Sequence, residues 1–84
     1  MTNAGSATDI EVIDVRSLAP AQRHARIFEL VGRLTPRDRF ILVNDPDPKP
    51  LYYQLVAEYT KQFSWTYVER GPQAWWVEIG KKAA

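Results

Sequence analysis

The sequence predicts an α/β (α+β) fold, a two-layer β-α-β-α-β-β sandwich in which two helices cover one face of a four-stranded mixed sheet. Two segments repeat apolar residues at helical spacing, residues 20–34 and 50–59. Four segments are rich in β-branched and aromatic residues, residues 10–15, 39–43, 63–69 and 75–79. Prolines and glycines separate several of these segments. Because two helices can cover only one face of such a sheet, the other face is expected to be open.

The first strand and the first helix follow from residue spacing. Residues 10–15 alternate, and β-branched residues dominate. Pro20 suits the first turn of a helix. Apolar side chains then recur at helical spacing, at Ile27, Leu30, Val31 and Leu34. Three arginines of the same segment fall largely on its outer side, Arg23, Arg26 and Arg33. Thr35-Pro36 ends the helix, because a residue before proline avoids the helical region.

The remaining elements are read in the same way. Residues 39–43 carry apolar side chains on both faces, which is typical of an interior strand. Pro50 can occupy the first turn of the second helix. Turn residues 70–74 join the last two alternating segments into an antiparallel hairpin, whereas strands separated by helices are expected to be parallel. One domain is expected over residues 9–80, between tails at 1–8 and 81–84.

Composition excludes several classes of protein. The 84 residues include no cysteine, so thiolate chemistry, disulfides and cysteine-based zinc sites are absent. Eleven basic and ten acidic residues give a net charge of +1, and neither half has the excess that nucleic-acid binding needs. The apolar runs are too short for a transmembrane helix or a signal peptide. We therefore expect a cytoplasmic protein that binds neither nucleic acid nor membrane.

The loop at residues 44–50 carries the main candidate ligand-binding side chains, Asn44, Asp45, Asp47 and Lys49. Its three prolines make it stiff, and it follows the carboxyl end of a strand. One interpretation is structural: one aspartate accepts backbone N–H bonds in the turn, and the other caps the second helix. The alternative is an oxygen-lined site for a hard metal ion or a cationic group.

His24, the only histidine, lies at the start of the apolar face of the first helix. A lone histidine there is most often a boundary residue with a hydrogen-bond partner. If the helix and the loop are adjacent, His24 can meet Asp45 or Asp47 and titrate near neutrality. These three residues are the candidate metal ligands. His24 with either Asp45 or Asp47 is also the only candidate acid–base pair for an enzyme.

Asp14 and Arg16 end the first strand and are further candidates for ligand binding. Parallel sheets place ligands beyond the carboxyl ends of their strands, so these residues should share a rim with Asn44 and Asp45. Arg16 could hold an anion there, or it could neutralise Asp45. The ion pair is the favoured interpretation.

The hairpin aromatics are candidates for an interface. Trp65 and Tyr67 share one side of the first hairpin strand, and Trp76 lies on the opposite side of the second strand from Val77. Whichever set faces the helices, a large side chain remains on the open face. Exposed aromatic area of this kind often marks an interface, so we expect a protein partner or a homodimer through the open face.

Several motifs of the chain occur together in a recognisable order. They are Asp14-Val15-Arg16, His24, Arg26-Ile27-Phe28, residues 42–45 and 47–54, Phe63-Ser64-Trp65, Gly71-Pro72 and Trp75. Together these motifs resemble a bacterial domain of unknown function, DUF2249. The resemblance covers about residues 10–80 and implies the TusA/SirA-like fold. The family has no established activity, so the resemblance leaves the cofactor unknown. Members also stand beside hemerythrin-like or cupin modules, which implies a redox or metal context.

The chain lacks two residues that related proteins carry, and their absence limits the chemistry that the resemblance implies. TusA-type carriers transfer sulfur through a Cys-Pro-x-Pro motif, whereas residues 18–21 here read Leu-Ala-Pro-Ala. Sulfur relay by that chemistry is therefore excluded. Many family members also carry histidine where this chain has Pro46, which removes one metal ligand. The favoured hypothesis is an accessory or binding domain, the second is a metal- or small-ligand-binding domain, and the third is an acid–base enzyme.

Overall fold

The computed structural model describes residues 10–59 and 62–82, and its elements follow the predicted order. They are β1 (Glu11–Asp14), α1 (Pro20–Arg33), β2 (Arg39–Asn44), α2 (Lys49–Tyr59), β3 (Phe63–Arg70) and β4 (Trp75–Lys81). Each boundary lies within two residues of its prediction. The tail expected at residues 1–8 lies outside the described residues, and Lys81, expected in the second tail, ends β4. Within the described residues, no helix is long and apolar enough to cross a membrane.

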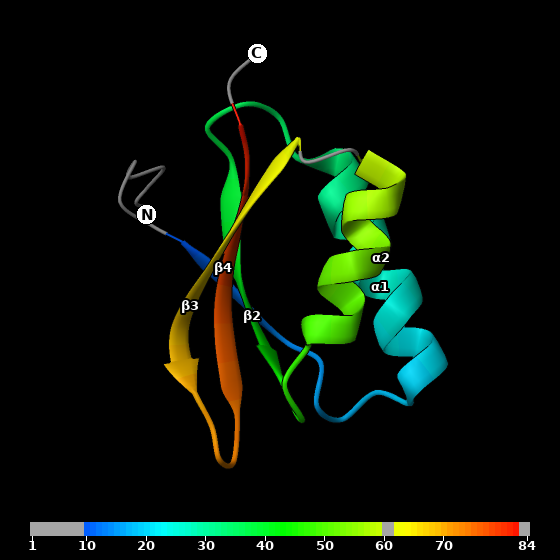
Figure 1. Cartoon of the computed structure of the whole chain (residues 1–84), viewed down its shortest axis with the longest axis vertical. Helices are drawn as coiled ribbons and strands as arrows, with labels where there is room; N and C mark the ends of the chain where they lie inside the picture. Colours follow the sequence, from blue (N-terminus) through cyan, green and yellow to red (C-terminus); the bar gives the residue numbers. More distant parts are fainter. Residues whose placement is uncertain (1–9, 60–61, 83–84) are drawn as a thin grey trace, which may run out of the picture.

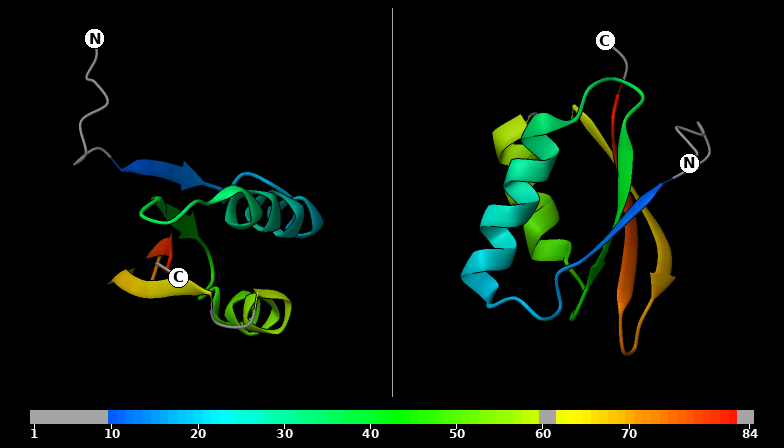
Figure 2. Two further views of the ribbon diagram at one scale, coloured as in Figure 1. Left: turned by 90° about the horizontal axis from the view of Figure 1, so that it is seen from above. Right: turned by 180° about the vertical axis from the view of Figure 1, so that it is seen from behind.

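The four strands form one mixed sheet in the order β1-β2-β4-β3. β1 and β2 are parallel, whereas β4 is antiparallel to both of its neighbours. The hairpin thus inserts β4 between β2 and β3, so β3 runs parallel to β2 without pairing with it. Both helices lie on one face of the sheet, and the described residues leave its other face uncovered, which confirms the two-layer prediction (Figures 1 and 2).

The core lies between the sheet and the helices. Leu42, Val77 and Ile79 of the central strands and Leu55 of α2 are 0% exposed, and Ile27 of α1 is 1% exposed. Full burial of one such side chain contributes about 1.5–3 kcal/mol to folding. The core is therefore built on the two strands that have a neighbour on each side, and the helices close it.

Strand register decides which hairpin aromatics face the helices. Trp65 lies opposite Ile79, and Tyr67 lies opposite Val77. Paired residues share a face, so Trp65 and Tyr67 pack against the core beneath α2. This corrects their assignment as open-face interface residues. Only Trp76 of the three interface candidates lies on the open face, since it alternates with the buried Val77.

A β-bulge interrupts β3 after Tyr67. Tyr67 pairs with Val77, but Glu69 rather than Val68 pairs with Trp76. Strict alternation would return Glu69 to the helix-covered face with Tyr67. The extra residue reverses that alternation, so Glu69 lies on the open face together with Val68, which is 54% exposed.

The hairpin turn depends on Gly71. The Gly71 N–H donates to the Ala74 carbonyl at 2.8 Å, and Gly71 has a φ of 54°. This left-handed conformation is easily reached only by glycine. The Trp75 ring lies directly against the Gly71 backbone. The turn is therefore closed by one hydrogen bond and covered by one aromatic ring.

Candidate functional site

Two strand ends and two helix starts meet at one rim of the sandwich. β1 and β2 are parallel, so their carboxyl ends lie together, and α1 and α2 both begin beside them (Figure 1). A cavity of about 270 Å³ opens here, which we call the rim cavity. Its lining residues are Pro20, Arg23, His24, Ile27, residues 44–48, Pro50, Leu51 and Gln54. Four of the seven candidate ligand-binding residues line this cavity, namely His24, Asn44, Asp45 and Asp47.

Arg23 ties the two sides of the rim together. Its Nη1 donates to the Asp45 carbonyl oxygen at 2.6 Å, to Asp45 Oδ1 at 2.9 Å and to Asn44 Oδ1 at 3.3 Å. Its Nε and Nη2 donate to the carbonyl oxygens of Leu18 and Arg16 at 2.8 and 2.7 Å. One guanidinium thus links the β1–α1 connector to the β2–α2 loop.

The prediction that Arg23 lies on the outer side of the helix was wrong. Its side chain is only 20% exposed. The sequence did contain a signal, because Arg23 precedes the buried Ile27 and Val31 by one and two helical turns. A long side chain at the first turn of that buried face reaches past the helix end and binds the neighbouring loop.

Asn44 and Asp45 are held by that guanidinium. Asn44 is 9% exposed, and its Nδ2 donates to the Pro46 carbonyl at 3.0 Å. With Oδ1 accepting from Arg23, both ends of the buried amide are satisfied. Asp45 forms an ion pair with Arg23, not with Arg16. Asn44 therefore shapes the loop, and the charge of Asp45 is already neutralised.

Asp47 connects the loop to α2 and to β3 through hydrogen bonds. Its Oδ1 accepts the backbone N–H of Lys49 at 3.1 Å and the Tyr67 hydroxyl at 2.6 Å. Asp47 therefore accepts the backbone N–H of the first residue of α2 and one hydroxyl from β3. Burial, and then the hydrogen bond donated to Asp47, raises the pKa of Tyr67. Lys49 contributes its backbone N–H to this arrangement, and its side chain does not line the rim cavity.

His24 lines the rim cavity together with the loop aspartates, but its ring packs against a residue of its own helix. Its ring stacks on Phe28, with centroids 4.3 Å apart and planes within 2°. In the parts of the chain that the structure describes, no hydrogen bond or ion pair joins His24 to Asp45 or Asp47. Nor do those parts bring three or more histidine, aspartate or glutamate residues together for a metal ion. The candidate metal set therefore shares a cavity without forming a coordination cluster.

Asp14 and Arg16 pair with each other at the end of β1. Arg16 Nη2 lies 2.7 Å from Asp14 Oδ2, and both Nε and the backbone N–H of Arg16 donate to Asp14 Oδ1 at 3.0 Å. The side-chain hydrogen bond from Arg16, followed by the backbone one, lowers the pKa of Asp14 from 3.8 to about 2. This pair corrects the expected Arg16–Asp45 contact, and neither residue lines the rim cavity.

Comparison with known proteins places the chain in a family. It matches the family described as "Uncharacterized conserved protein (DUF2249)" over residues 12–81. The chain belongs to the DUF2249 family. The matched span runs from the second residue of β1 to the end of β4. No curated protein and no solved structure matches the chain.

The loop aspartates of this DUF2249 domain are hydrogen-bonded to residues other than His24. A general base must lie within hydrogen-bond reach of its partner, and His24 has no such contact with either aspartate among the described residues. Asp45 and Asp47 accept bonds from Arg23, Tyr67 and Lys49. His24 and Gln54 contribute further polar side chains to the rim cavity, and sequence reasoning did not single out Gln54.

Asn substitution of Asp14 should remove part of the acid sensitivity of the DUF2249 domain. A folded-state pKa of about 2 against 3.8 means that Asp14 stabilises the fold above pH 3.8. That stabilisation is lost as the pH falls from about 4 to 2. The carboxylate is half exposed, so solvent limits the effect to less than about 1 kcal/mol.

Urea unfolding measured across this pH window tests the Asp14 prediction. The Asp14→Asn variant should show a shallower loss of stability than the unmodified domain. Glu11→Gln, at the other end of β1, is the control and should keep the full slope. Equal slopes for the Asp14 variant and the unmodified domain would contradict the prediction.

Proposed function

We propose that this DUF2249 protein is a binding domain that takes a compact organic molecule into the rim cavity. The observation that carries the proposal is the cavity itself, a concave space of about 270 Å³ whose wall is mainly apolar. Pockets of about 300–1,000 Å³ with apolar walls and a few convergent polar groups are the usual form of small-molecule sites. The rim cavity lies just below that range, which favours a ligand smaller than a drug-sized one.

The lining residues indicate the chemistry of this ligand. The apolar wall consists of Ile27, Leu51 and the four prolines at positions 20, 46, 48 and 50. The imidazole of His24 and the amide of Gln54 offer one hydrogen-bonding group on each helix. A molecule with an apolar body and one or two hydrogen-bonding groups matches this surface.

The rim is also stiff, which favours binding. Prolines 46, 48 and 50 each fix their own φ angle. Arg23 joins the connector and the loop, and Asp47 joins the loop to Tyr67. A preorganised site loses little conformational entropy when its ligand binds. The residues of the rim therefore support recognition through their arrangement as well as through their chemistry.

A fragment screen followed by amide NMR shifts tests this function. Fragments with an apolar ring and one hydrogen-bonding group should shift the signals of His24, Asn44 and Gln54 in a saturable manner. A domain carrying both His24→Ala and Gln54→Ala should bind the best fragment about tenfold more weakly, since two hydrogen bonds of about 0.5–1.5 kcal/mol are lost.

The matched control for this screen is Gln73→Ala, an exposed glutamine in the hairpin turn. Gln73 lies outside the rim cavity, so this variant should bind the fragment as the unmodified domain does. Fragment shifts spread over the whole surface, or an unchanged affinity in the double variant, would overturn the proposed function.

A further inference from the structure

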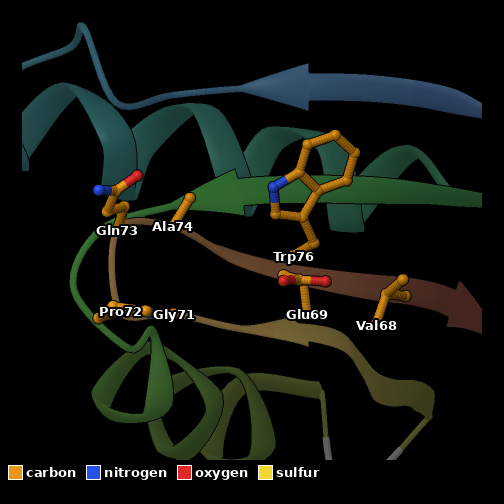
Figure 3. Close-up of a pocket in the computed structure, with 7 residues that line it drawn as sticks. All are labelled: Val68, Glu69, Gly71, Pro72, Gln73, Ala74 and Trp76. Carbon is orange, nitrogen blue, oxygen red and sulfur yellow. The ribbon is translucent and has the colours of Figure 1, made fainter.

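A second cavity lies on the open face, where the hairpin turns. It has a volume of about 650 Å³ and is lined by Val68, Glu69, Gly71, Pro72, Gln73, Ala74 and Trp76; we call it the hairpin pocket. Figure 3 shows the Trp76 indole and the Glu69 carboxylate projecting from neighbouring strands to the same side. The turn residues form the end of the pocket. It shares no lining residue with the rim cavity.

The bulge in β3 brings the aromatic ring and the carboxylate together. Glu69 pairs with Trp76 only because Val68 is an extra residue in the strand. The indole extends over β2 in Figure 3. Val43 of β2 pairs with Trp76 and is 1% exposed although it lies on the open-face side. Trp76 and Glu69 therefore lie opposite one another on neighbouring strands, with both side chains on the open face.

The charge of Glu69 has no counter-ion among the described residues. The neighbouring Arg70 lies over the Tyr67 ring, 4.6 Å from its centroid and on the helix-covered side. Arg39, the basic residue on the open face of β2, pairs with Glu78 at 3.4 Å. The other residues that line the hairpin pocket are uncharged, so the pocket carries one net negative charge.

We propose that the hairpin pocket binds an organic cation, either an alkylammonium or a guanidinium group. The cation would lie over the Trp76 indole, whose π face attracts positive charge, and would pair with the Glu69 carboxylate. Tryptophan is the best of the aromatic side chains for this contact. A cavity of about 650 Å³ admits a side chain of the length of lysine or arginine. The cation is either a free amine or guanidine or the basic side chain of a partner protein.

Two isosteric compounds test the need for positive charge. Nα-acetylarginine amide (arginine amide below) carries a guanidinium group as its only charge, and Nα-acetylcitrulline amide (citrulline amide below) carries an uncharged urea group of nearly the same shape. Arginine amide should shift the Trp76 indole N–H and the Glu69 amide signals in a saturable manner. Citrulline amide should bind about fivefold more weakly, the order of magnitude of a partly exposed cation–π contact. Equal affinity for both compounds would overturn the proposal.

Two glutamate variants test the assigned site. Glu69→Gln should weaken arginine amide about fivefold while keeping the shape of the pocket. Glu78→Gln is the matched control, because Glu78 lies on the same face but pairs with Arg39. It should leave the affinity within twofold. Glu69→Gln is a surface change that preserves the fold, so an unchanged affinity in this variant would also overturn the proposal.

A capped tripeptide with central arginine distinguishes the two sources of the cation. Tighter binding of the tripeptide than of arginine amide assigns the pocket to the side chain of a partner protein. Equal binding assigns it to a free cation, and both results support the pocket as a cation site. If none of these cations produces a saturable shift, the proposed cation site is overturned. This holds whatever the outcome of the fragment screen at the rim cavity.

Discussion

Gly71→Ala is expected to lower the free energy of unfolding by about 3 kcal/mol, the largest effect of any substitution considered. A Cβ at this position would lie 2.5, 2.7 and 2.9 Å from three atoms of the Trp75 ring, closer than real Cβ contacts. The left-handed φ of 54° adds a backbone penalty of about 1–2 kcal/mol for alanine. Displacing the ring adds an overpacking penalty of about 1–3 kcal/mol.

Urea unfolding followed by far-UV circular dichroism measures this loss. Gln73→Ala, in the same turn but exposed, is the control and should change stability by less than about 0.5 kcal/mol. The Gly71 variant should also lose the Gly71–Ala74 hydrogen bond. A loss below about 1 kcal/mol would show that the turn and Trp75 relax more easily than the contact distances imply.

Arg23→Ala is expected to cost about 2–3 kcal/mol. The guanidinium donates to three backbone carbonyls, Leu18, Arg16 and Asp45, and to two side chains. Its removal leaves the half-buried carbonyls of both loops and the carboxylate of Asp45 without this partner. Leaving a buried polar group unpaired costs about 1–3 kcal/mol, and entry of water into the rim reduces the total.

Arg26→Ala is the matched control, because Arg26 lies one turn of α1 away and, within residues 10–59 and 62–82, its ion pair is an exposed one with Glu29. It should change stability by less than about 0.5 kcal/mol. Arg23→Lys keeps the charge but loses the planar set of donors, and it should fall between the two alanine variants. Similar losses for Arg23→Ala and Arg26→Ala would show that Arg23 does not organise the rim.

Hydrophobic periodicity was sufficient to predict the architecture. Each helix and strand could be read from spacing, because the core faces are continuous in sequence within each element. The strand order β1-β2-β4-β3 could not be read in this way, since it depends on which edge the hairpin joins. The placement of Trp65 and Tyr67 depended on the same unknown, because alternation gives two faces without saying which one the helices cover.

The sequence predicted where the loop residues of the candidate site lie, but not which residues they bind. Asn44, Asp45 and Asp47 were expected at the rim, and all three line its cavity. Their partners were not expected, because Arg23 and Tyr67 come from elements that are distant in sequence. Propensity and spacing describe single elements, whereas hydrogen bonds between elements depend on how the elements pack. Glu69 was missed for a related reason, since a bulge leaves no clear mark in a run of strand-forming residues.

The bulge at Val68 also affects how the sheet meets other sheets. β3 is an edge strand, and an unbroken edge strand presents a row of free N–H and C=O groups that can pair with a strand from another chain. An extra residue bends such a strand, twists it locally and breaks the even spacing of those groups. Continuous edge-to-edge pairing past Tyr67 is therefore disfavoured. The residue that brings Glu69 to the open face thus also protects the domain against aggregation through its longest exposed edge.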